Sequence, residues 1–217
     1  MQRKQALATS HIYHVFNRSI ANYTIFPSPR HYARFTEMLS YYQLDGLVNK
    51  FSKASAKISF AATIQELQQT KKRRVDILAY CLMPNHFHLL LKQNEEKGIS
   101  NFMQNLQNSY SHFFNIRHKR QGPLWAGKFK NVLCESDEQL LHLSRYIHLN
   151  PVTAQLVDNP ENWAATSYQE YISPESAHAT ICHSDYISVS PQNYPSFVNN
   201  HIDEQRALAK IKNLFFD

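Results

Sequence analysis

The residues best suited to bind a metal ion are two histidines separated by one phenylalanine. They lie in residues 83–91, MPNHFHLLL. On a β-strand alternate side chains share a face, so His86 and His88 would point the same way with Cβ atoms roughly 7 Å apart. This spacing suits two imidazoles that bind one metal ion. The alternative interpretation is a pair of surface-facing histidines.

A second group of candidates lies sixty residues further on, in residues 145–151, RYIHLNP. If this segment is a helix, Tyr146 and Asn150 lie one turn apart on one face. The carboxamide oxygen of Asn150 can then be a third metal ligand, beside a phenol that reaches the substrate. His148 is expected to point away from Tyr146. Together these residues predict a site for metal-assisted attack on a phosphodiester.

The proposed nucleophile needs help, because a phenol with a pKa near 10 is a poor nucleophile at neutral pH. A divalent ion that polarises the scissile phosphate lowers the barrier to attack. Two imidazoles and a carboxamide add no negative charge and leave open positions, which favours Mg²⁺ or Mn²⁺ over a closed Zn²⁺ site. With only four glycines, the chain lacks a phosphate-cradling loop, which agrees with chemistry that needs no ATP.

Less specific interpretations stay open for each candidate. Tyr146 can instead be a core tyrosine of a helix, and Tyr110 is a rival nucleophile, although its neighbours are apolar. Asn150 can simply cap the helix before Pro151.

Charge is distributed unevenly along the chain. Residues 1–130 carry a net charge of +13 and residues 131–217 a net charge of −7, which together give the overall +6. A basic body that contains the histidine pair is expected to bind a polyanion. No signal-peptide pattern or membrane-length apolar run is found, and the three cysteines form no CxxC pair, so we expect a soluble, cytoplasmic protein without a membrane partner.

The order of expected elements predicts an α+β, ferredoxin-like split βαβ fold. It consists of a four-stranded antiparallel sheet with helices on one face and an added C-terminal catalytic helix. Hydrophobic patterning places the elements, in chain order, at strand 10–18, helix 29–42, strands 75–83 and 86–92, helix 99–118, strand 129–135, and a helix from Ser136 to about Leu149 that stops at Asn150-Pro151.

Two segments lie outside this plan. Residues 43–74 form an insertion, with one helix expected near 61–69 and a basic end. The main domain is predicted to cover residues 1–171, and residues 172–217 form a C-terminal extension with a short amphipathic helix near 203–215.

Three blocks in sequence resemble the single-tyrosine HUH transposases, in particular the REP-associated tyrosine transposase branch. The blocks are CLMPNHFHLL at 81–90, GPLW at 122–125 followed by KFK at 128–130, and YIHLNPV at 146–152. The resemblance covers roughly residues 10–171. The chain departs from the family pattern at 17–19, with NRS in place of NRG, and at 163–168, WAATSY.

The resemblance implies an enzyme that cleaves and rejoins single-stranded DNA near hairpins through a 5′-phosphotyrosine. It makes His86 and His88 the metal ligands with Asn150, and Tyr146 the nucleophile. The protein would act as a monomer or homodimer. Other hypotheses are a domesticated hairpin-binding protein that does not cut, and a metal-dependent phosphodiesterase that uses water.

Several basic and aromatic residues are candidates for DNA contact. Trp125 would suit base stacking beside phosphate contacts, although a place in the core is equally compatible with its sequence context. The basic run 71–74 can also be a solvated surface segment. The candidates are Arg18, Lys71, Lys72, Arg73, Arg74, Trp125, Lys128 and Lys130.

Overall fold

A four-stranded antiparallel sheet forms the centre of the protein in the computed structural model, which describes residues 6–56, 59–175 and 181–207. The strands are β1 (Ile12–Arg18), β2 (Val75–Met83), β3 (His86–Gln93) and β4 (Lys130–Cys134), in the order β2-β3-β1-β4. Every neighbouring pair is antiparallel. This is the predicted ferredoxin-like arrangement, which the structure confirms.

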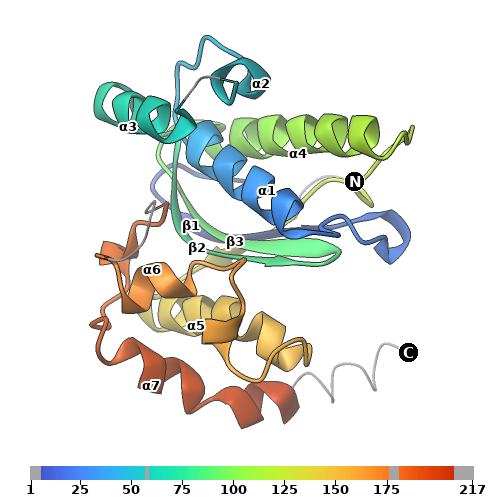
Figure 1. Ribbon diagram of the computed structural model, residues 1–217. Helices are drawn as coiled ribbons and strands as arrows, with labels where there is room; N and C mark the ends of the chain where they lie inside the picture. Colours follow the sequence, from blue (N-terminus) through green and yellow to red (C-terminus); the bar gives the residue numbers. More distant parts are fainter. Residues whose placement is uncertain (1–5, 57–58, 176–180, 208–217) are drawn as a thin grey trace.

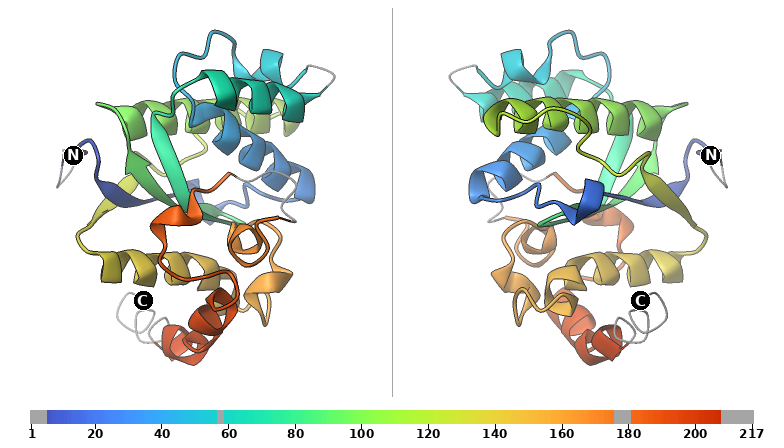
Figure 2. Two further views of the ribbon diagram at one scale, coloured as in Figure 1. Left: turned by 90° about the vertical axis from the view of Figure 1, so that its left-hand side faces the viewer. Right: turned by 90° about the vertical axis from the view of Figure 1, so that its right-hand side faces the viewer.

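Helices cover both faces of the sheet. α1 (Pro29–Tyr42) and α4 (Gly98–Arg117) lie on one face, and α5 (Asp137–Thr153) lies on the other, as the side views in Figure 2 show. The hydrophobic core between the sheet and the α1–α4 layer is rich in aromatic rings. Phe35 lies 5.4 Å from Phe87 and 5.0 Å from Tyr110 between ring centroids.

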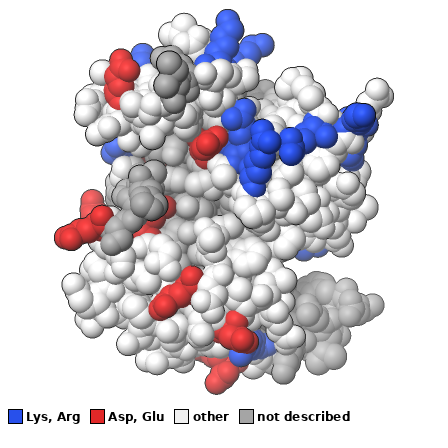
Figure 3. Space-filling view, in the orientation of Figure 1, with Lys and Arg blue, Asp and Glu red and all other residues white. Residues whose placement is uncertain are grey.

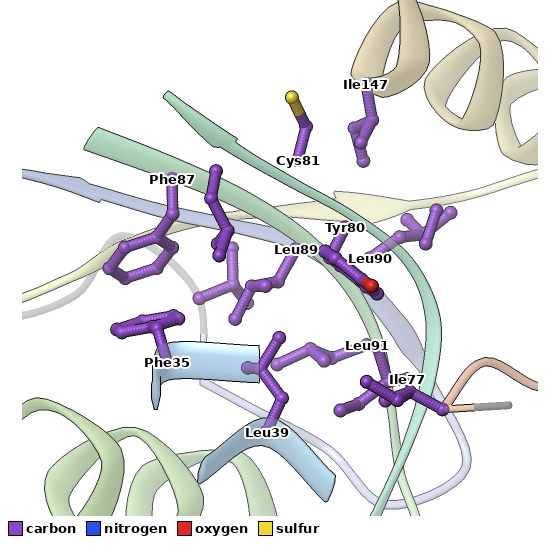
Figure 4. Close-up of a cluster of buried hydrophobic side chains, with 14 of the residues drawn as sticks. Phe35, Leu39, Ile77, Tyr80, Cys81, Phe87, Leu89, Leu90, Leu91 and Ile147 are labelled. Atoms are coloured by element: carbon purple, nitrogen blue, oxygen red, sulfur yellow. The ribbon is translucent and has the colours of Figure 1, made fainter. Parts of the chain in front are cut away.

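Side-chain alternation along the strands separates the two faces. In Figure 4, Phe87 points toward Phe35 of α1, whereas Cys81 points to the other side, where Ile147 of α5 lies. Cys81 is the cross-strand partner of His88. The face opposite Phe87 is therefore the one that His86 and His88 share with α5.

The helix α5 begins as predicted but ends later. The Ser136 hydroxyl accepts the N–H of Gln139 at 3.2 Å, and the Gln139 amide oxygen accepts the N–H of Glu135 at 2.7 Å. The predicted stop at Asn150-Pro151 is wrong, because the helix continues to Thr153 with Pro151 inside it. Proline is tolerated there because only the last turn is affected and few backbone hydrogen bonds remain to be lost.

The insertion contains two helices, α2 (Phe51–Ala54) and α3 (Phe60–Thr70). α3 confirms the helix expected near 61–69, and α2 is an addition. The Ser59 hydroxyl accepts the N–H of Ala62 at 3.2 Å and so begins α3 with a side-chain cap.

The C-terminal part packs on α5 and on the free edge of β2. It contains the short segments η2 (Pro160–Asn162), α6 (Tyr168–Ile172), η3 (Ser184–Tyr186) and α7 (Tyr194–Asn199). Residues 202–207 are also helical, and the rest of the helix predicted near 203–215 lies outside the described residues. No helix within the described ranges is long and apolar enough to cross a membrane.

His148 connects these segments to α5. It is fully buried; its Nδ1 lies 2.8 Å from the Tyr194 hydroxyl and its Nε2 lies 2.7 Å from the Ser167 hydroxyl. The carboxylate of Glu170 accepts the N–H groups of Ile181 and Cys182 at 2.7 and 2.8 Å. Buried polar contacts therefore join the predicted extension to the helix that carries Tyr146.

Replacing Tyr194 by phenylalanine is expected to lower the free energy of unfolding by about 1–3 kcal/mol, because a buried imidazole nitrogen of His148 loses its partner. Urea unfolding followed by circular dichroism measures the change. Tyr23→Phe, at an exposed tyrosine, is the control and should be near neutral. Equal stability of the Tyr194 variant and the wild type would contradict a structural role for this contact.

Candidate active site

Three of the four predicted site residues come together on the α5 face of the sheet. The ring centroid of His88 lies 5.1 Å from that of His86 and 5.7 Å from that of Tyr146. The rings of His86 and Tyr146 each meet the His88 ring edge-on, at 84° and 88°. Two histidines of β3 and a tyrosine sixty residues further along the chain thus form one cluster of side chains on this face.

Local structure explains the convergence. His86 and His88 lie at alternate positions of β3, so they share a face. α5 crosses that face, and its residue Tyr146 is half-buried against the sheet. His148 is turned away into the C-terminal packing, as predicted.

His86 is held in a form that suits a metal ligand. Its Nδ1 donates to the Asn85 side-chain oxygen at 2.6 Å, since a carboxamide oxygen can only accept. The Nε2 lone pair therefore faces away from Asn85. Burial, with a smaller contribution from the nearby Arg18 guanidinium, lowers the pKa of His86 to about 4, so the imidazole is neutral at pH 7.

Tyr146 is a neutral phenol at physiological pH. Burial raises the pKa of its hydroxyl above the ordinary value. Because burial disfavours the charged phenolate, loss of the phenol proton is costly. Attack by this oxygen on phosphorus therefore requires a group that lowers the activation barrier.

Asn150 lies one turn after Tyr146 and uses its amide nitrogen within the helix. Its Nδ2 donates to the Tyr146 carbonyl at 2.8 Å and lies 3.4 Å from the Ile147 carbonyl, whose usual N–H partner is lost because residue 151 is proline. Asn150 therefore does not cap the helix end as the alternative interpretation expected, because α5 continues to Thr153, but its amide nitrogen partners carbonyls inside the helix. This leaves the Oδ1 atom as the ligand-type atom of the side chain.

The donor set fits a hard divalent cation. Two imidazoles and one carboxamide oxygen are compatible with Mg²⁺ or Mn²⁺ when phosphate oxygens complete the coordination. Among the described residues, no group of three or more His, Cys, Asp and Glu side chains is placed to hold a metal. The ligand roles of His86, His88 and Asn150 stay predictions.

Tyr110 lies in the core, as its apolar sequence context indicated. It is fully buried between the sheet and α1, and its hydroxyl donates to the Ile25 carbonyl at 2.6 Å. Burial raises its pKa strongly. Since α4 covers the face opposite α5, Tyr110 is separated from the histidine pair by the sheet.

The candidate DNA-contacting residues fall into different places. Arg18 is exposed and is the cross-strand partner of His86 at the edge of the site. Lys128 and Lys130 are also exposed. Trp125 packs edge-on against Phe87 at 5.4 Å, and its indole N–H donates to a main-chain carbonyl of α4, so the structure favours its core interpretation.

The basic run 71–74 lies at the other end of β2 from the histidines. Arg74 is buried and paired with Asp45, and the Arg73 guanidinium lies 2.8 Å from Asp76. These two guanidinium groups therefore have partners inside the protein. Lys72 is exposed and Lys71 is half-buried. DNA contact by this run stays a prediction, and the ion pairs of Arg73 and Arg74 count against it.

Sequence reasoning missed one member of the cluster, His14 of β1. Its ring centroid lies 5.1 Å from that of His88 and 5.9 Å from that of Tyr146. The alternation of the first strand puts His14 on one face with Phe16 and Arg18, but the pairing of β1 with β3 was needed to identify that face.

Comparisons with known proteins agree with this fold. The family model described as transposase, IS200-like, matches residues 47–150. A Haemophilus influenzae protein assigned to the REP-associated tyrosine transposases is 26% identical over 110 residues, which cover 46% of this chain and 62% of that protein. A solved structure of a REP-associated tyrosine transposase bound to a REP hairpin has a TM-score of 0.55 at 12% identity and covers 84% of this chain and 90% of its own.

The fold, a four-stranded antiparallel sheet flanked by helices, is thus shared with that solved structure. Residues 47–150 are similar to the IS200-like transposases, and part of the chain is also similar in sequence to a REP-associated tyrosine transposase.

Proposed function

We propose that this protein is a metal-dependent DNA transposase that cleaves and rejoins single-stranded DNA near hairpins through a 5′-phosphotyrosine on Tyr146. The observation that carries the proposal is the convergence of Tyr146 with His86 and His88 on one face of the sheet. The similarity of residues 47–150 to the IS200-like transposases supports the same reaction class.

His86, His88 and Asn150 would hold the divalent ion. When bound, Mg²⁺ or Mn²⁺ supplies Lewis-acid polarisation of the scissile phosphate. The chain contributes the preorganisation: Asn85 fixes the His86 ring, and the α5 turn fixes Tyr146 and Asn150 relative to each other.

Tyr146 provides the nucleophile. Its phenol gives up a proton to solvent as the oxygen forms a bond to phosphorus and the bond from phosphorus to the 3′ oxygen breaks, and the leaving oxygen takes a proton from solvent to become a 3′-OH. The phosphodiester energy is kept in the phosphotyrosine. A second 3′-OH can therefore reverse the step, releasing Tyr146 and joining two strands without ATP.

The surface charge favours a nucleic-acid partner. On the face that Figure 3 shows, Lys and Arg gather over the part that contains α1 and α4, the layer opposite the histidine pair, whereas Asp and Glu predominate over the part that contains α5 to α7. Arg18 brings positive charge to the edge of the site, beside His86. The solved REP-associated tyrosine transposase is bound to a REP hairpin, so hairpin DNA is the first substrate to test.

One experiment separates this proposal from its alternatives. Single-stranded DNA with a hairpin, labelled at its 3′ end because the 5′-phosphotyrosine retains that part of the strand, is incubated with the protein and Mn²⁺, and products are separated on denaturing gels. A labelled protein band supports the phosphotyrosine. Binding in a native gel without any cleavage would instead identify a hairpin-binding protein, and free cut ends without an adduct would identify a phosphodiesterase that uses water.

Hairpin affinity is expected to fall steeply with ionic strength. On single strands, log K should fall against log salt with a slope of about −0.7 for each phosphate neutralised. Fluorescence anisotropy between roughly 50 and 300 mM NaCl, about a sixfold range of salt concentration, measures the slope. Affinity that does not change over this range would show that the basic body is not the DNA face.

A further inference from the structure

His14 makes a direct contact with one of the two site histidines. Its Nε2 lies 2.9 Å from the Nδ1 of His88, at hydrogen-bond distance, with the two rings stacked at 22°. His14 is 7% exposed and His88 8%, so bulk water does not compete freely for this contact. β1 lies next to β3, and Phe16 pairs with His88, which makes His14 a diagonal neighbour of His88 on the same face.

A hydrogen bond between two imidazoles fixes which nitrogen carries the hydrogen. If His88 donates from Nδ1, its Nε2 keeps the lone pair that a metal ligand needs. If His14 donates from Nε2, the hydrogen of neutral His88 lies on Nε2, and that atom cannot bind a metal. The direction of this one bond therefore decides whether His88 is a competent ligand.

We infer that His14 is a positioning residue, which accepts the Nδ1 hydrogen of His88 and so holds the His88 Nε2 lone pair toward the cation site. This inference rests on the proposed function. It assigns to His14 the part that Asn85 has for His86, where a carboxamide oxygen accepts from Nδ1 at 2.6 Å. Each histidine of the pair thereby receives its own orienting partner.

The surroundings of His14 agree with an orienting role. Its ring lies against Phe16 on one side, at 5.0 Å, and meets Tyr146 edge-on, at 5.9 Å. These contacts hold the ring plane on the same face as the nucleophile. A residue that only filled space here could be apolar, whereas His14 directs a ring nitrogen at His88.

The first test reads the tautomer of His88 directly, in the full chain without metal or DNA. Long-range ¹H–¹⁵N correlation spectra distinguish the Nδ1–H from the Nε2–H form of each imidazole, and a His88→Gln variant assigns the signals. The inference expects His88 as the Nδ1–H tautomer. An Nε2–H tautomer of His88 in the wild-type protein would overturn it, and no substitution at position 14 is needed for that outcome.

The second test measures Mn²⁺ binding by calorimetry. His14→Phe keeps a ring but removes the acceptor, and it should weaken Mn²⁺ affinity by about 10–100-fold. His14→Gln places an amide oxygen near the position of the Nε2 atom and should restore affinity to within about threefold of wild type. Phe16→Leu loosens packing on the same face without touching the bond and should change affinity less than about threefold.

The controls separate failure of the inference from failure of the proposed function. Wild-type protein that binds no Mn²⁺, or binds it equally after His86→Ala, contradicts the metal site itself. Binding that is lost in His86→Ala but unchanged in His14→Phe leaves the site intact and overturns the role of His14. Equal losses in His14→Phe, His14→Gln and Phe16→Leu would show a packing role and would also overturn it.

Discussion

Replacing Tyr146 by phenylalanine is expected to eliminate the covalent protein–DNA adduct. The substitution removes one oxygen atom and keeps the ring that packs against His14 and His88. Loss of a nucleophile typically lowers turnover by roughly 10⁴-fold or more. Denaturing gels with labelled hairpin DNA and Mn²⁺ give the measurement, while native gels should show hairpin binding close to that of the wild type.

Tyr110→Phe is the matched control, because it removes the same atom from the other buried candidate. It leaves the Ile25 carbonyl without its partner and should lower the free energy of unfolding by about 1–3 kcal/mol. Adduct formation should nevertheless persist at temperatures where the variant is folded. An adduct with the Tyr146 variant but none with the Tyr110 variant would make Tyr110 the nucleophile and refute the assignment.

Removing either histidine of the pair is expected to abolish cleavage while leaving hairpin binding largely intact. A metal ion contributes several kcal/mol to stabilising developing charge, and each 1.36 kcal/mol is tenfold in rate, so His86→Ala and His88→Ala should each lose about 10³-fold. Affinity for DNA comes mostly from phosphate contacts, which these substitutions do not touch. Single-turnover cleavage and anisotropy measure the two effects separately.

An exposed histidine on the opposite layer provides the control for this pair. His112 of α4 is exposed, and His112→Ala should cleave at the wild-type rate. Excess chelator should mimic the loss of His86 or His88 in the wild-type protein. Cleavage near the wild-type rate in both histidine variants, or in excess chelator, would exclude the proposed metal site.

Much of the scaffold followed from local patterns. The alternation around His86 and His88 predicted that both would share a face, and the helical spacing of residues 29–42 matched α1 at both ends. The i and i+4 spacing of Tyr146 and Asn150 needed only the geometry of a helix. These features depend on residues close together in the sequence, so no knowledge of strand pairing was required.

Other features depended on contacts between distant segments. The tertiary structure placed His14 on His88, 74 residues away, because β1 inserts between β3 and β4. It also placed Arg74 in an ion pair with Asp45 across the insertion, where the sequence showed only a basic run.

The end of α5 illustrates the same limit. Pro151 predicted a stop, but the packing of His148 on Tyr194 and Ser167 holds the following turn against the C-terminal segments. The sequence by itself therefore determined which residue types could do the chemistry and on which elements they lie. Only strand pairing and buried polar contacts decided which side chains meet and which ring nitrogen of His86 and of His88 has a side-chain partner, because these contacts depend on residues whose positions the fold alone sets.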